Sequence, residues 1–160
     1  MFEKYTENAR RVIFLARYEV SRFGSESIEP EHLLLGLLRE DKALVARFLP
    51  AHVSTHMIRG QVESYLTRGE RIPTSVEIPL GRMSKDVLKY AREESQNLKH
   101  GHIGTEHLLL GLLRQQKSRG LWRKSESVAE RVLRENGLAV EEIRQRIKSE
   151  AERSSRRGIG

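Results

Sequence analysis

One nine-residue segment, Glu-His-Leu-Leu-Leu-Gly-Leu-Leu-Arg, occurs twice in the sequence without a change. It spans residues 31–39 and returns 75 residues later (106 minus 31) at residues 106–114. Internal repetition constrains the fold more than any other feature, because each copy must adopt the same local structure. A period near 75 exceeds the roughly 20 to 50 residues of common solenoid repeats, and only two copies fit within 160 residues. The sequence therefore predicts one pseudo-symmetric domain.

Each copy has the pattern of about four helices. The first helix is expected to begin after Thr6, a good N-cap, and to end at Gly24, whose type suits the left-handed residue that closes many helices. The corresponding position in copy two is Lys99. The prediction is an all-α fold of about eight helices, in two pseudo-twofold-related four-helix repeats that form one globular domain. We place this domain at residues 1–147, with repeat one at about 2–66, an extended linker at 67–82, repeat two at about 83–147 and a basic flexible tail at 148–160.

The repeated segment is apolar on nearly every side, which is typical of a helix enclosed by its neighbours. A glycine interrupts each copy, at Gly36 and Gly111. Glycine inside a helix costs about 1 kcal/mol relative to alanine, so we expect each of these residues to permit the close approach of another helix. We interpret the two segments as the core, packed against each other about the pseudo-twofold axis.

Composition limits the compartment and the class of partner. The chain has no cysteine, which fits a reducing compartment, and its longest apolar run is far shorter than the roughly 18 residues of a membrane span. We therefore expect a cytoplasmic protein. The net charge of +7 comes partly from basic residues in an insertion and in the tail, which favours a solvated surface over a nucleic-acid groove. These residues are Arg119, Arg123, Lys124, Arg153, Arg156 and Arg157.

Sequence signatures of catalysis are absent. The chain contains no phosphate-binding loop of the P-loop or dinucleotide type, no zinc-protease motif and no nucleophile elbow. We therefore expect neither an enzyme nor an ATPase in this chain, and no cofactor.

Histidines near the second copy are a possible metal site. Adjacent residues such as Glu106 and His107 point about 100° apart on a helix and cannot chelate one ion together. His100, His102 and His107 could cluster, but no cysteine or aspartate lies nearby. We expect these histidines to cap or pack, and predict no metal.

Glu31 and Glu106 begin the repeated segment and so lie in the first turn of equivalent helices. A carboxylate beside unsatisfied helix-start N–H groups offers one site for a cation and one for an anion, which suits a mixed-charge ligand. The alternative is that each glutamate only stabilises its own helix start, by about 0.3 to 1 kcal/mol. The residues alone leave both interpretations open.

The motifs together resemble a known family, the double Clp repeat. They are Thr6-Glu-Asn-Ala9, Gly24, Ile28, the twice-repeated Glu-His-Leu-Leu-Leu-Gly and the preceding His-Ile-Gly104-Thr. This module is the N-terminal domain of Clp-family AAA+ unfoldases of the ClpC and ClpA types, and the resemblance covers roughly residues 2–147. It implies an all-α domain that recruits substrate or adaptor proteins to an unfoldase ring, in cis or in trans, and performs no chemistry itself.

The resemblance also implies which residues bind a ligand. In the ClpC branch the motif glutamate binds the guanidinium of phosphoarginine, and helix-start amides hold its phosphate. Carried over, this nominates Glu106 and Glu31, with Ile103 and Ile28 beside them, and copy two keeps Gly104 and Thr105.

Copy one departs from the motif in the two residues before Glu31. Pro30 lacks an N–H, and Glu29 places a negative charge near a phosphate, so copy one is the weaker candidate.

Copy two also carries an insertion at about residues 116–126 that holds Trp122. An exposed tryptophan on a basic loop would be a partner-binding anchor, whereas a buried one would fold back on the core. Two further hypotheses remain for the whole chain. One is a regulator or inhibitor of a Clp ATPase, and the other, less favoured, is a nucleic-acid-binding protein.

Overall fold

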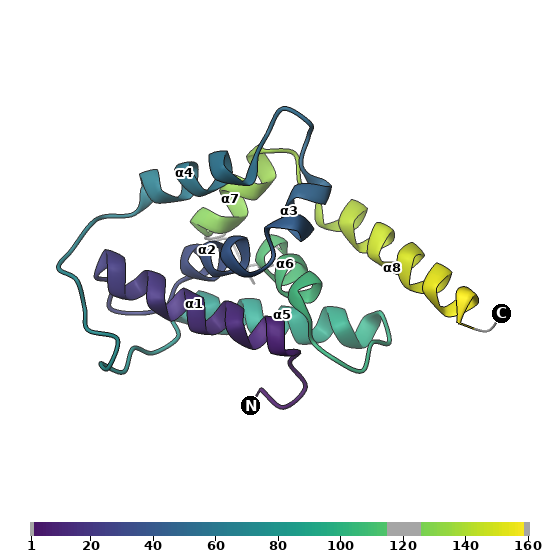
Figure 1. Ribbon diagram of the computed structural model, residues 1–160, viewed down its shortest axis with the longest axis horizontal. Helices are drawn as coiled ribbons and strands as arrows, with labels where there is room; N and C mark the ends of the chain where they lie inside the picture. Colours follow the sequence, from purple (N-terminus) through teal and green to yellow (C-terminus); the bar gives the residue numbers. More distant parts are fainter. Residues whose placement is uncertain (1, 115–125, 159–160) are drawn as a thin grey trace, which may run out of the picture.

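The computed structural model describes residues 2–114 and 126–158, and within these ranges it contains eight α-helices (Figure 1). Apart from two isolated β-bridges, the described residues form no strand pairing. The predicted all-α fold of two four-helix repeats is confirmed. The helices are α1 (Glu7–Phe23), α2 (Pro30–Glu40), α3 (Lys42–Phe48), α4 (Thr55–Tyr65), α5 (Arg82–Asn97), α6 (Thr105–Leu113), α7 (Val128–Glu135) and α8 (Val140–Arg157).

The two repeats interlock through the residues that precede α1 and α5. Tyr5, just before α1, forms a parallel bridge with Ile103 of the second copy, and Leu80, just before α5, forms one with Ile28 of the first. Both isoleucines are buried, and one continuous apolar core runs through both repeats. The linker is therefore tied into one domain, and Gly69 N–H, for example, donates to the Phe23 carbonyl at 2.9 Å.

The glycines of the repeated segment lie where two helix backbones meet. α2 packs on α1 and α6 packs on α5, and α2 and α6 also touch in the centre of Figure 1. A Cβ added at Gly111 would lie 2.5 Å from the Val87 carbonyl oxygen of α5. One added at Gly36 would lie 2.9 Å from the Ala16 nitrogen of α1. Close approach is thus confirmed, and the helix approached is the first helix of the same repeat.

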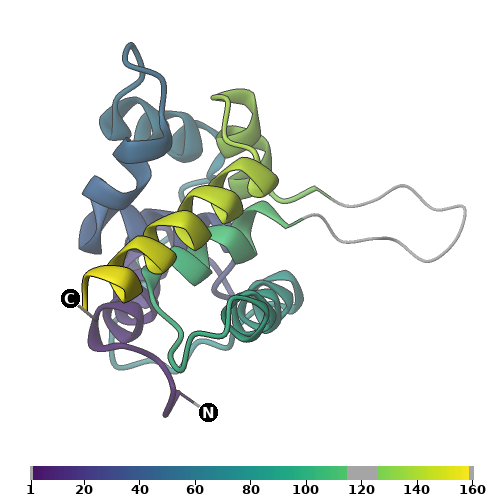
Figure 2. The same cartoon turned by 90° about the vertical axis from the view of Figure 1, so that its right-hand side faces the viewer.

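Residues 148–157 are helical, so the prediction of a flexible tail there was wrong. α8 continues to Arg157 and crosses one face of the domain beside α3 and α6 (Figure 2). The sequence shows no apolar stripe in this stretch, but its Glu, Lys, Arg and Ala residues are good helix formers. Glu150 of α8 also forms an ion pair with Arg47 of α3.

Each repeat buries one glutamate among arginines. In copy one, Glu19 of α1 is fully buried and accepts hydrogen bonds from Arg39 of α2 and from Arg59 of α4, the latter at 2.9 Å. Its burial raises the pKa, but the hydrogen bonds from Arg59 and Arg39 outweigh this effect, so the pKa of Glu19 is lowered. The carboxylate therefore stays charged and joins three helices.

Copy two repeats this cluster. Glu94, which is 1% exposed, lies 75 residues after Glu19 and accepts a hydrogen bond from Arg144 Nε of α8 at 2.8 Å. Arg114, the equivalent of Arg39, lies 3.9 Å from the same carboxylate. Hydrogen bonding to Glu94 raises the pKa of Arg144. Helical periodicity assigns charged residues to the surface, so the sequence analysis missed both clusters.

Candidate functional site

Glu106 and Thr105 line a pocket of about 390 Å³ at the start of α6. Their side chains meet residues of α3 from the first repeat and of α8 from the end of the chain. The pocket is therefore built by both copies, and the stretch expected to be a flexible tail forms one of its walls. The other lining residues are Asp41, Ala43, Leu44, Arg47, His100, Ile147, Glu150, Ala151 and Ser154.

Asp41 connects the two repeats at the floor of this pocket. One oxygen of Asp41 accepts the α3 N-cap hydrogen bond from Leu44 N–H at 3.3 Å, and the other accepts from the Thr105 hydroxyl at 2.8 Å. Asp41 thus caps a backbone N–H group at the start of α3 and holds the side chain of Thr105, the first residue of α6. No local sequence pattern predicts this contact, because the two partners lie 64 residues apart.

The pocket holds both signs of charge. Glu106, Asp41 and Glu150 supply carboxylates, and Arg47 supplies a guanidinium that pairs with Glu150. The Arg47 and Glu150 side chains are both nearly half exposed, so a ligand can compete for them at little cost. Such an arrangement suits a ligand with one cationic and one anionic group.

The histidine of each repeated segment caps its own helix. Gly104 N–H donates to His107 Nδ1 at 2.8 Å, and Glu29 N–H donates to His32 Nδ1 at 2.9 Å. This is the reciprocal half of a capping box, with histidine in the place usually taken by glutamate or glutamine. The prediction that the histidines cap or pack is therefore correct for His107, and His32 caps its helix in the same way in copy one.

With the histidine caps formed, the starts of α6 and α2 differ in the backbone N–H groups that remain free to donate. In copy two, the N–H groups of Thr105 and Glu106 have no intrahelical partner and remain available for an anion. In copy one, Pro30 has no N–H, and the carboxylate of Glu31 bonds its own backbone N–H. The nearby charge of Glu29 also acts on Glu31. Burial is the main cause that raises the pKa of Glu31, and Glu29 raises it further.

The histidine of copy one makes the stability of the domain depend on pH. Burial lowers the pKa of His32 to about 4, although the charges of Glu29 and Glu19 oppose the effect. The unfolded chain binds a proton near pH 6.5, so this contribution is complete above that pH and is lost as pH falls toward 4. We expect a loss of about 3 kcal/mol in the free energy of unfolding across this range.

Urea denaturation at several pH values measures this effect. The His32→Asn variant, which does not titrate, serves as the comparison, because carboxylates contribute to both proteins alike. The variant should show a flatter pH profile between pH 6.5 and 4.5. Parallel profiles for the two proteins would contradict the assignment.

Four groups beside α6 approach one another closely enough to hold a metal. Each of His100, His102, Glu106 and His107 offers one ligand atom, and these atoms lie within 4.8 Å of one another. A backbone N–H can only donate, so His107 Nδ1 must accept, and the neutral ring carries its proton on Nε2. That nitrogen faces His100 Nδ1 at 2.8 Å. His107 therefore has no free lone pair while the cap is formed, and the absence of a metal stays a prediction.

The remaining predicted site residues lie elsewhere. Ile103 lines a different pocket, and Glu31 and Ile28 lie outside both pockets. Gly104 packs beneath the carboxylate of Glu106, whose Oε2 would be 2.6 Å from a Cβ at that position. Trp122 falls outside the described residues.

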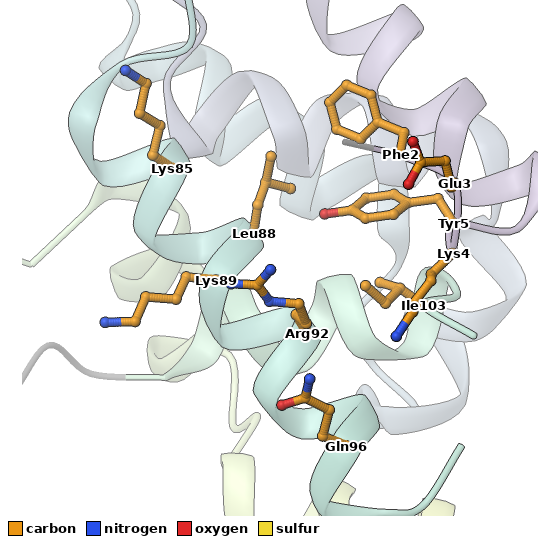
Figure 3. Close-up of a pocket in the computed structure, with 10 residues that line it drawn as sticks. All are labelled: Phe2, Glu3, Lys4, Tyr5, Lys85, Leu88, Lys89, Arg92, Gln96 and Ile103. Atoms are coloured by element: carbon orange, nitrogen blue, oxygen red, sulfur yellow. The ribbon is translucent and has the colours of Figure 1, made fainter. Parts of the chain in front are cut away.

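The second pocket, of about 460 Å³, lies between the N-terminal segment and α5 (Figure 3). Phe2, Tyr5, Leu88 and Ile103 form its apolar part (Figure 3). Four basic side chains and one carboxylate, that of Glu3, also line the pocket, so the positive charge is not confined to the insertion and the tail. The basic side chains are Lys4, Lys85, Lys89 and Arg92.

Comparisons with known proteins bear on the family. Residues 4–121 match the family model described as Clp repeat (R) N-terminal domain. The chain is 35% identical over 148 residues to the Bacillus subtilis (strain 168) protein called negative regulator of genetic competence ClpC/MecB, covering 92% of this chain and 17% of that protein. It is 38% identical over 148 residues to the chloroplastic chaperone protein ClpC of Pisum sativum, covering 92% of this chain and 15% of that protein. The chain thus spans only about a sixth of these relatives.

Solved structures with low sequence identity share the fold. The N-terminal domain of the ClpD chaperone from Arabidopsis thaliana superposes with a TM-score of 0.67 at 23% identity, covering 95% of this chain and 97% of that one. The Hsp104 N-terminal domain from Candida albicans gives 0.66 at 23% identity, covering 89% and 88%. Among the described residues, no helix has the length and hydropathy needed to cross a membrane.

Proposed function

The chain belongs to the family of Clp repeat N-terminal domains, and from this premise we propose that it is a binding module that recruits substrate or adaptor proteins to a Clp-type unfolding system. Two pockets support a binding role, one with charges of both signs and one apolar with a basic rim. The module would perform no chemistry itself, and it would act in a reducing compartment such as the cytoplasm.

We propose that the pocket at the start of α6 recognises phosphoarginine on tagged proteins. The observation that carries this proposal is that Glu106 and Thr105 share one pocket with Arg47. The carboxylate of Glu106 is the partner for the ligand guanidinium, and Asp41 adds a second negative charge on that side. The free N–H groups of Thr105 and Glu106 and the guanidinium of Arg47 are the partners for the phosphate.

Copy one is proposed to bind such a ligand more weakly. Pro30 removes one helix-start donor, and Glu31 already uses its carboxylate on its own N–H. Glu29 lies close enough to raise the pKa of Glu31 and would also repel a phosphate. The two copies share the repeated segment but differ in the two residues before it. We attribute the proposed difference in ligand affinity to these two residues.

The pocket of Figure 3 is proposed to receive a protein segment that combines acidic and apolar side chains. Phe2 and Tyr5 line this pocket and contact each other edge to face, with ring centroids 5.0 Å apart. Lys85 and Lys89 follow each other by one helical turn at the rim. Aromatic anchors within a charged rim are typical of protein recognition sites.

A degradation assay tests the recruiting role. We expect a ClpC-type ring and its protease to degrade a model substrate faster when the chain is present and able to bind both. The Lys85→Glu/Lys89→Glu double variant should lose part of this effect, whereas Lys148→Glu on α8 should not. Slower degradation in the presence of the chain would instead support a regulator or inhibitor.

A further inference from the structure

A third pocket, which we call the α2–α4 basic pocket, lies where the C-terminal end of α2 meets the N-terminal end of α4. Its volume is about 290 Å³, and no carboxylate lines it. It shares no residue with the two pockets described above. Its lining residues are Leu38, Arg39, Lys42, Thr55, His56 and Arg59.

The two arginines of this pocket are held in place from below. The buried carboxylate of Glu19 accepts from Arg39 Nε and from Arg59 Nη2. The Arg39 guanidinium also lies over the ring of Tyr18, 5.4 Å from its centroid, and Arg59 Nε pairs with Glu63 at 3.0 Å. Both terminal nitrogens of Arg39 and Nη1 of Arg59 make no hydrogen bond to the described residues. These donors are therefore preorganised at the pocket with their hydrogen-bonding capacity unused.

The equivalent arginines in copy two are neutralised by added carboxylates. Arg114 Nη1 donates to Glu93 at 2.8 Å, and Glu93 takes the place of Tyr18. Arg144 Nη1 donates to Glu141, three residues before it, where copy one has His56 three residues before Arg59. Carboxylates thus outnumber these arginines in copy two. In copy one, Lys42 instead adds a further positive charge, and no carboxylate lines the pocket.

We propose that the α2–α4 basic pocket binds a phosphate-type oxyanion, in particular a phosphate monoester on a partner protein. The guanidinium fork matches phosphate oxygens bidentately, and two forks fixed by one buried carboxylate lose little freedom on binding. The hydroxyl of Thr55, the first residue of α4, and the positive end of the α4 helix dipole add to this field. The side chains of Arg39 and Arg59 are 37% and 21% exposed, so a side chain on a protein surface can reach them.

An amide NMR titration at constant ionic strength tests the site in the full chain. The probes are inorganic phosphate, a short phosphoserine peptide and the same peptide without phosphate. Binding of a phosphorylated probe should shift the amides of Lys42, Thr55 and His56, whereas the unphosphorylated peptide should not. Stronger binding of the phosphopeptide would assign the site to partner proteins, and equal or stronger binding of inorganic phosphate would assign it to a small anion.

The decisive variant is His56→Glu, which places in copy one the carboxylate that copy two already has. His56 is exposed, so the fold should be retained, as the unfolding midpoint in urea will verify. Because a new carboxylate would occupy the free donor of Arg59, we expect phosphate binding to weaken about tenfold. Lys148→Gln, on α8, is the control for net charge. Unchanged binding by His56→Glu, or no amide shifts with either phosphorylated probe, would overturn the proposal.

Discussion

The Gly111→Ala variant is expected to lose about 3 kcal/mol of unfolding free energy, since overpacking a tight interface costs of this order. The added methyl would lie 2.5 Å from the Val87 carbonyl oxygen and 3.1 Å from the Ala91 nitrogen. These are backbone atoms of α5 and cannot move aside as a side chain can. α5 and α6 would have to separate, which loosens packing along their whole length. A domain of this size has only about 5 to 15 kcal/mol of stability, so urea denaturation should show a large decrease in midpoint.

Gly60→Ala is the matched control within α4. No atom lies within 4 Å of a Cβ built at Gly60, so only helix propensity changes there. Alanine is better than glycine inside a helix, and we expect a gain of about 0.5 to 1 kcal/mol. If both variants changed stability by the same small amount, the close contact of α5 with α6 would not be what requires glycine.

The Glu94→Gln variant is also expected to lose about 3 kcal/mol of unfolding free energy. This value is at the lower end of those for breaking a buried ion pair. Arg144 and Arg114 are 25% and 28% exposed, so water partly compensates the charges left behind. The hydrogen bonds from Arg144 would weaken, and α8 would lose its main polar attachment to α5. Equilibrium denaturation measures the loss, and the far-UV circular dichroism of the native state should remain largely unchanged.

Glu150→Gln tests whether this loss is specific to burial. The Arg47–Glu150 pair also attaches α8, but both side chains are nearly half exposed. Exposed pairs contribute about 0 to 1 kcal/mol, so this variant should be almost as stable as the parent. Equal losses at positions 94 and 150 would mean that burial does not govern the contribution of these glutamates.

Local sequence was sufficient to predict the helices and several of their details. The repeated segment predicted paired, enclosed helices and the need for Gly36 and Gly111. The alignment of Gly24 with Lys99 at the end of the first helix of each copy agrees with the structure, because both residues adopt left-handed backbone angles, with φ of 76° and 58°. These features depend on residues within one helix and its ends, where periodicity and cap preferences act directly.

Contacts between the repeats could not be predicted in the same way. Asp41 and Arg47 belong to copy one but line the pocket of Glu106 in copy two. Such contacts depend on how the two units are placed relative to each other, and the sequence contains no periodic signal for this placement. α8 was missed beyond residue 148 because its outer part has no apolar stripe, and the Arg47–Glu150 ion pair joins residues far apart in the sequence.

For the histidines, the sequence predicted that they cap a helix or pack in the core, without deciding between these two roles. A glutamate or glutamine three residues after the N-cap is the usual signal for a capping box, and the motif has histidine there. The structural role was favoured over a metal site because adjacent Glu and His side chains point about 100° apart on a helix and because no cysteine or aspartate lies near these histidines.

The measurement that tests the central claim most directly is a titration of the chain with free phosphoarginine, followed by amide NMR shifts. The claim is that the identical repeats are unequal as binding sites because of the residues that precede Glu31 and Glu106. We expect shifts centred on residues 104–107, and binding at least about tenfold weaker in Glu106→Ala, as expected for the loss of one charge-assisted hydrogen-bonding partner. Glu31→Ala should bind like the parent. Parent-like binding by Glu106→Ala, or an equal loss in both variants, would contradict the account.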